Sequence, residues 1–80
     1  MKFIMDIERE EAINVASVKR LYADQVNSDD SHVAYVMAQL FDEKDDIYLK
    51  EFYSGDKDEN FAAAKKYLAE LVASLNGGQS

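Results

Sequence analysis

The sequence predicts an α+β fold, in which a four-stranded antiparallel β-meander is followed by one C-terminal α-helix packed on one face of the sheet (ββββα). Three observations predict it. The C-terminal part of the chain has the periodicity and the end signals of an amphipathic helix. Four earlier segments are rich in β-branched and aromatic residues and are separated by polar stretches. A chain of 80 residues without cysteine has the size of one domain, residues 1–80, whose stability must come from its apolar core and from any second subunit.

The expected elements have approximate bounds. Strands are expected at residues 2–8, 12–23, 32–42 and 46–53, a helix at residues 57–75, and a tail at residues 76–80. An all-α bundle is the alternative fold, because two of the four strand segments also place their apolar side chains at helical spacing.

The first expected strand alternates in polarity. Phe3, Met5 and Ile7 form its apolar face, and Ile4 is an apolar exception on the polar face. Residues 8–11 are polar and form a short connection without a glycine or asparagine that would specify a hairpin type.

The second expected strand carries an irregularity. Its β-branched and aromatic residues favour a strand, although Val15, Val18 and Tyr22 also fit a helix. We expect a break or bulge between Asn14 and Ser17, where the apolar face changes register. Residues 24–31 contain Asp, Asn and Ser and are expected to form a loop.

The third and fourth strands are expected to form a hairpin, because consecutive strands usually pair and residues 42–46 make a polar turn. Alternation divides the side chains of each strand between two faces. In the third strand Ala34, Val36, Ala38 and Leu40 oppose Val33, Tyr35, Met37 and Phe41. In the fourth strand Ile47, Leu49, Glu51 and Tyr53 oppose Tyr48, Lys50 and Phe52. The face with small residues suits a closely packed helix.

The C-terminal helix has both ends marked. Asp56 and Glu59 have the spacing of a capping box, and negative charge near a helix N-terminus is favourable. Asn76 and Gly77 favour a helix end. The apolar stripe consists of Phe61, Ala64, Leu68, Leu71, Val72 and Leu75.

One helix covers only one face of a sheet, so apolar side chains remain on the other face. The interface candidates there are Tyr35, Met37, Phe41, Tyr48 and Phe52. Exposed aromatic and methionine side chains are typical of protein interfaces. We therefore expect a homodimer that associates through this face or through edge strands, with another protein as a possible further partner.

Charge and composition argue against several classes of function. The net charge is −7, from 16 acidic against 9 basic residues, which argues against a nucleic-acid-binding surface and against docking on anionic membranes. The chain has no signal-peptide pattern and no apolar run long enough to span a bilayer, which favours a cytoplasmic protein. An acidic inhibitor or nucleic-acid mimic, binding a basic protein groove, is the alternative function. It requires one contiguous acidic face made of Asp24, Asp29, Asp30, Asp42, Asp45, Asp46, Asp56 and Asp58.

No pattern predicts catalysis, a cofactor or a metal. His32 is the only histidine and has no nucleophile motif near it. The stretch 56–60 resembles the start of a calcium loop, but Phe61 stands where that loop needs glycine. The acidic residues of 42–46 are explained by a solvated turn. A small enzyme with a pocket around His32 or paired carboxylates is a further alternative. The prediction is a small, non-enzymatic, dimeric interaction module.

Overall fold

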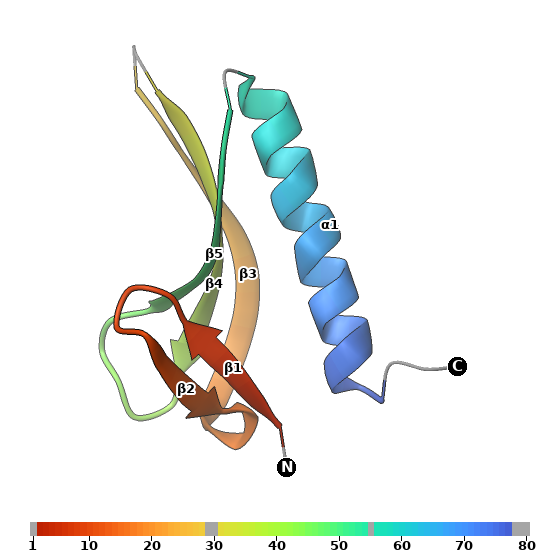
Figure 1. Cartoon of the computed structure of the whole chain (residues 1–80). Coiled ribbons are helices and arrows are strands. Elements are labelled where there is room, and N and C mark those ends of the chain that lie inside the picture. The colour runs from red at the N-terminus through yellow and green to blue at the C-terminus, as the bar shows by residue number, and fades with distance from the viewer. Residues whose placement is uncertain (1, 29–30, 55, 78–80) are drawn as a thin grey trace.

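The computed structural model describes residues 2–28, 31–54 and 56–77 (Figure 1). Within these residues the chain forms two antiparallel sheets and one α-helix. The elements are β1 (Phe3–Asp6), β2 (Glu11–Asn14), the 3₁₀ turn η1 (Val15–Ser17), β3 (Val18–Asn27), β4 (His32–Leu40), β5 (Ile47–Tyr53) and α1 (Lys57–Leu75). Helix α1 lies along one face of the sheet β3–β4–β5, and the β1–β2 hairpin lies at one end of that sheet (Figure 1). The α+β class is confirmed, and the all-α alternative is wrong.

The predicted four-stranded meander is not a single sheet, because the second predicted strand divides in two. The break expected between Asn14 and Ser17 is the turn η1, which Asn14 stabilises by accepting a hydrogen bond from the Ala16 backbone N–H at 2.9 Å. β1 and β2 form one sheet, and the order of the other is β3–β4–β5. The loop predicted at 24–31 is also too long, because β3 continues to Asn27 in unbroken pairing with β4.

The core lies between α1 and the sheet. Ala34, Val36 and Ala38 on β4 and Ala64 on α1 are fully buried, as the alternation in β4 predicted. Alanines at the contact allow the helix backbone to approach the sheet closely, and the larger core side chains fill the space around them. The remaining buried members of this core are Ile4, Leu40, Ile47 and Leu49.

A bulge in β5 changes which side chains face the helix. Tyr48 pairs with Met37 and Lys50 pairs with Val36, so Leu49 has no residue opposite it. The extra residue reverses the alternation beyond it. Phe52 was predicted to share a face with Tyr48, but it packs on the helix side, edge-to-face with Tyr67 at a centroid distance of 5.9 Å.

Strand β1 has the opposite orientation to the predicted one. Ile4 and Asp6 are buried, whereas Phe3, Met5 and Ile7 are 55%, 54% and 42% exposed. The buried Asp6 is satisfied within its own turn, because its Oδ1 accepts hydrogen bonds from the backbone N–H groups of Glu8 and Arg9 at 3.0 and 3.2 Å. Burying an unpaired carboxylate would be costly, which is why the polarity pattern predicted an exposed Asp6. The two hydrogen bonds offset this cost.

Both ends of α1 are capped within the described residues. Asp56 Oδ1 accepts from the N–H groups of Asp58 and Glu59, at 2.9 and 3.2 Å, which confirms the predicted N-terminal cap. At the other end Lys2 Nζ donates to the carbonyl oxygens of Ser74 and Leu75, at 2.7 and 3.3 Å. The last turn of α1 has no basic residue of its own, so Lys2, immediately before β1, supplies the positive charge that a helix C-terminus favours. Of the predicted tail 76–80, residues 78–80 lie outside the described part.

Candidate functional site

The face of the sheet opposite α1, here called the open face, is organised in rows that cross β3, β4 and β5. The pairing places side chains of the three strands side by side and on the same side of the sheet. The rows are Val26–Val33–Tyr53, Asp24–Tyr35–Glu51 and Tyr22–Met37–Tyr48. In the second and third rows, tyrosines, carboxylates and Met37 therefore replace the alanines and aliphatic residues of the covered face.

The tyrosines enclose Met37. This side chain is only 7% exposed although it points away from the helix. Tyr22 and Tyr48 flank it on the neighbouring strands, and Tyr35 precedes it on its own face of β4. Tyr35 and Tyr48 meet edge-to-face, with a centroid distance of 4.8 Å and an interplanar angle of 72°. Such aromatic pairs add rigidity to the surface as well as buried area.

Tyr22 is held by charged neighbours on two sides. Its hydroxyl donates a hydrogen bond to the carboxylate of Asp46, and the guanidinium of Arg20 lies 4.7 Å from its ring centroid. Burial, the hydrogen bond to Asp46 and the negative charges of Asp46 and Asp24 raise the pKa of Tyr22 to about 12, against a smaller opposing effect of Arg20. Tyr22 is therefore a neutral donor at physiological pH.

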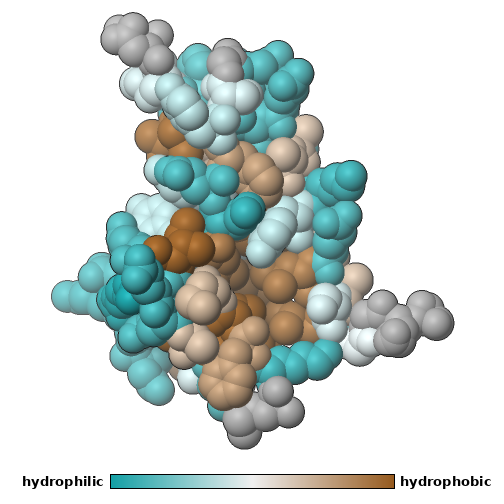
Figure 2. Space-filling view, viewed as in Figure 1, coloured by the Kyte–Doolittle hydropathy of each residue, from teal (hydrophilic) through white to brown (hydrophobic). Residues whose placement is uncertain are grey.

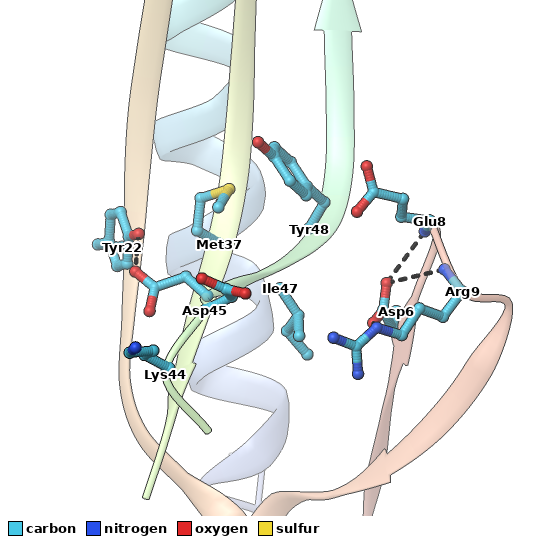
Figure 3. Close-up of a pocket in the computed structure, with 10 residues that line it drawn as sticks. Asp6, Glu8, Arg9, Tyr22, Met37, Lys44, Asp45, Ile47 and Tyr48 are labelled. Atoms are coloured by element: carbon cyan, nitrogen blue, oxygen red, sulfur yellow. Dashed lines mark hydrogen bonds and ion pairs between the residues drawn. The ribbon is translucent and has the colours of Figure 1, made fainter. Parts of the chain in front are cut away.

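A concave region of about 560 Å³ lies between the open face and the β1–β2 hairpin (Figure 3). Figure 3 shows Tyr22, Met37 and Tyr48 on the sheet side, and Glu8 and Arg9 on the hairpin side. Other charged groups line the same region: Asp6, Lys44, Asp45 and Asp46.

Arg9 closes one side of this region. Its Nη1 lies 3.3 Å from Glu43 in the β4–β5 turn and 3.8 Å from Glu11, and its Nε lies 3.8 Å from Asp6. The hairpin loop and the β4–β5 turn are thus linked by an exposed ion pair, which stabilises their relative position only modestly.

A smaller cleft of about 250 Å³, here called the tyrosine cleft, lies beside this region. Its lining consists of Ile7, Glu8, Tyr35, Tyr48 and Glu51. Burial raises the pKa of Tyr35, and the charge of Glu51, the neighbouring Tyr48 and the charge of Glu8 raise it further. The two glutamates therefore direct a negative field at the Tyr35 hydroxyl, although they lie 43 residues apart in the sequence (51 − 8).

A second, apolar surface lies on the side of the molecule where β1 faces α1. A groove of about 180 Å³ is lined there by Phe3, Ile4, Met5, Leu49, Tyr67 and Leu71. We call this surface the β1–α1 patch. Figure 2 shows apolar side chains gathered between the hairpin and the helix.

The five interface candidates do not lie on one surface. Tyr35 and Tyr48 are partly exposed on the open face, and Met37 lies beneath them. Phe41 is 64% exposed immediately after β4, whereas Phe52 belongs to the covered face. The exposed Phe3 and Met5 were missed, because an alternating strand is expected to bury its more apolar side; the apolar Ile4 was the only sign of the reverse orientation.

The acidic residues divide between the two ends of the sheet. Asp42 and Asp45 lie in the β4–β5 turn, whereas Asp56 and Asp58 lie at the start of α1, beside the end where β4 begins. The ends are separated by about 25 Å of strand. Asp24 lies between them on the open face, and the predicted residues Asp29 and Asp30 lie outside the described part. This distribution does not favour the single acidic face that a nucleic-acid mimic requires.

His32 has a structural environment at the start of β4. Its Nδ1 lies 3.0 Å from Asn27 Oδ1 across the β3–β4 pair, and its carbonyl oxygen accepts a hydrogen bond from the buried Asn60 Nδ2 at 2.8 Å. None of the clefts described above includes His32 in its lining. Asn60, which joins α1 to β4, was not predicted, because the cap residues beside it explained its polarity.

Residues 2–28, 31–54 and 56–77 carry the signature neither of a metal centre nor of a membrane-spanning helix. In that part of the chain no group of three or more His, Cys, Asp or Glu side chains is arranged to hold a metal ion. Nor does it contain a helix whose length and apolarity would allow it to cross a bilayer.

Comparison with protein-family models, curated proteins and solved structures gives no match to this chain. Two surfaces of the described structure are candidates for recognition: the tyrosine cleft on the open face and the β1–α1 patch.

Proposed function

We propose that this protein is a small, non-enzymatic interaction module that acts as a cytoplasmic homodimer and associates through the β1–α1 patch. The observation that carries the proposal is the exposure of Phe3 and Met5, more than half of each side chain, beside an apolar groove. Exposed apolar surface of this kind is typical of protein–protein contacts. The sequence predicts a dimer through the open face or through edge strands. Association through an edge strand fits this surface, because β1 is an edge of a two-stranded sheet.

Electrostatics also favours this surface. Each chain carries a net charge of −7, so two copies repel one another over most of their surface. Of the residues that the structure describes, none that lines the groove beside Phe3 and Met5 is charged. Contact at this patch would therefore remove apolar area from water without bringing charged residues of the groove lining together.

A two-fold arrangement suits the geometry of the patch. In an isologous dimer the same surface is used twice, so Phe3 and Met5 of one copy would enter the groove beside Leu71 of the other. Stable interfaces bury about 800 Å² per partner. That is about 15% of the 5456 Å² surface of the described structure, so the contact would extend beyond the groove along α1, where Val72 is 39% exposed.

Sedimentation velocity and light scattering test the proposal. At about 100 μM, far above a micromolar Kd, the wild type should have the mass of a dimer. Phe3→Glu and Met5→Glu should both give monomers, because each places a charge in the apolar contact. Phe41→Glu is the matched control, since Phe41 is equally exposed but lies at the β4–β5 turn. A monomeric wild type, or a dimer that survives both β1 variants, would contradict the proposal.

A further inference from the structure

We propose that the tyrosine cleft binds the guanidinium group of an arginine side chain presented by a partner protein. The site extends the proposed interaction module to a second partner, and none of the residues that line it lines the groove of the β1–α1 patch. Binding of arginine and dimer formation can therefore fail independently.

The cleft combines aromatic walls with carboxylates from separate segments. Tyr35 on β4 and Tyr48 on β5 supply two rings, already fixed by their edge-to-face contact. Glu51 comes from β5 and Glu8 from the loop after β1, while Ile7 supplies an apolar wall. The Ile7 backbone N–H donates to the carbonyl oxygen of Tyr48 at 2.9 Å, which joins the hairpin loop to β5 at the cleft. The site is therefore built by the fold and does not depend on one flexible loop.

The charge around the cleft is one-sided. Tyr35 lies between Asp24 and Glu51 in the same cross-strand row, and Glu8 approaches from the hairpin. The cleft lining contains no basic residue. Across the part of the chain that the structure describes, no ion pair neutralises Glu8 or Glu51.

Two of the basic residues on this side of the molecule are already engaged, and Lys44 lines the neighbouring concave region but not the cleft. Arg9 makes its ion pairs with Asp6, Glu11 and Glu43, and the Arg20 guanidinium lies over the ring of Tyr22. The contact between Arg20 and Tyr22 shows, one row away, the type of cation–π contact that an incoming arginine would make. The tyrosine cleft thus has the aromatic and acidic groups of such a contact without its cation.

Arginine fits this combination better than other ligands. A guanidinium is planar, it stacks on aromatic faces and it donates to carboxylates in a fixed geometry. Lysine can use the charge but not the planar fork. A hard metal ion would need a shell of oxygen ligands, which aromatic walls do not provide. The net charge of −7 would also attract a basic partner before contact.

The test is an NMR titration of the full chain with the peptide acetyl-Gly-Arg-Gly-amide. Addition of the peptide should shift the backbone amides of residues 8, 35, 48 and 51 more than others. The same peptide with citrulline, which is isosteric and uncharged, should produce no such shifts. Glu51→Gln and Glu8→Gln should each raise the Kd by about tenfold, because each removes a charge-assisted hydrogen bond. Tyr35→Leu should weaken binding as well, and Tyr35→Phe should retain most of it.

The controls separate a specific site from general acidity. Glu70→Gln removes the same charge from an exposed position on α1 and should leave the Kd unchanged. A Kd that rises equally in all three glutamate variants, or shifts spread over the whole acidic surface, would overturn the proposal. Spermidine binding as tightly as the peptide would overturn the assignment to a protein side chain. The dimer mass of the same samples, measured in parallel, reports on the proposed function separately.

Discussion

The two faces of the sheet β3–β4–β5 are made by the same strands but have different compositions. On β4, Ala34, Val36 and Ala38 point towards α1 and are fully buried, whereas Tyr35 and Met37 point the other way. Small residues on the covered face set the distance to the helix, and large amphipathic residues on the open face remain accessible at their polar ends. The comparison indicates that the covered face holds the fold together and that the open face is available for recognition.

The largest expected effect on the free energy of unfolding comes from a matched pair of truncations, one on each face of the sheet. Leu40 on the covered face and Met37 on the open face are almost equally buried, at 5% and 7% exposed. Leu40→Ala should destabilise the protein by about 2–5 kcal/mol, because it leaves a cavity between sheet and helix. Met37→Ala should cost about 1–2 kcal/mol, because the partly exposed tyrosines around it can move inwards and water can enter.

Urea unfolding followed by circular dichroism measures both free energies of unfolding. Equal losses for the two variants would show that the open face is a second core, and the distinction between the faces would then fail.

The sequence predicted the alternation of β4 and the N-terminal cap of α1, but neither the orientation of β1 nor the face of Phe52, for a physical reason. The alternation of β4 and the caps of α1 are local patterns, and local patterns survive in the fold. The orientation of β1 depended on Asp6, whose carboxylate is satisfied by the N–H groups of its own turn, and polarity alone does not reveal this. The face of Phe52 depended on the bulge at Leu49, which inserts one residue without any glycine to mark it.

The tyrosine cleft could not be predicted for a related reason. Its two carboxylates, from Glu8 and Glu51, come together only because the β1–β2 hairpin returns to β5 through the Ile7 to Tyr48 hydrogen bond. No spacing of residues in the sequence predicts that contact. Tyr35 and Tyr48 were predicted as interface candidates on this face, which stays a prediction, and their acidic neighbours were treated as solvated charges.

The pH dependence of the free energy of unfolding measures what Tyr22, on the open face, contributes to stability. The pKa of Tyr22 is raised from 10.0 to about 12, so the folded protein holds this proton more tightly than the unfolded chain. The resulting stabilisation is fully present below pH 10 and is lost as the pH rises from 10 towards 12. Tyr22→Phe should lose about 1–2 kcal/mol at neutral pH, with the hydrogen bond to Asp46, and should decline less steeply above pH 10.

Unfolding free energies measured between pH 7 and pH 11 test this expectation. Tyr53→Phe is the matched control, because Tyr53 is 66% exposed at the other end of the open face. An alkaline decline that is identical in wild type and Tyr22→Phe would contradict the role assigned to the Asp46 contact. A residual decline in Tyr22→Phe is expected, since the pKa of Tyr35 is also raised.

The smallest expected effect concerns the hairpin loop that carries Glu8 to the open face. Glu10 in this loop has a φ of 58°, in the left-handed region that glycine adopts without cost. Glu10→Gly should therefore raise the free energy of unfolding by about 0.5–1 kcal/mol. The covered face should be unaffected, and the Kd for the arginine peptide should stay the same, because Asp6 and the Ile7 to Tyr48 hydrogen bond still hold the loop. If Glu10→Gly stabilises the protein but weakens peptide binding, the left-handed residue itself positions Glu8, and the open face uses backbone strain that the covered face does not contain.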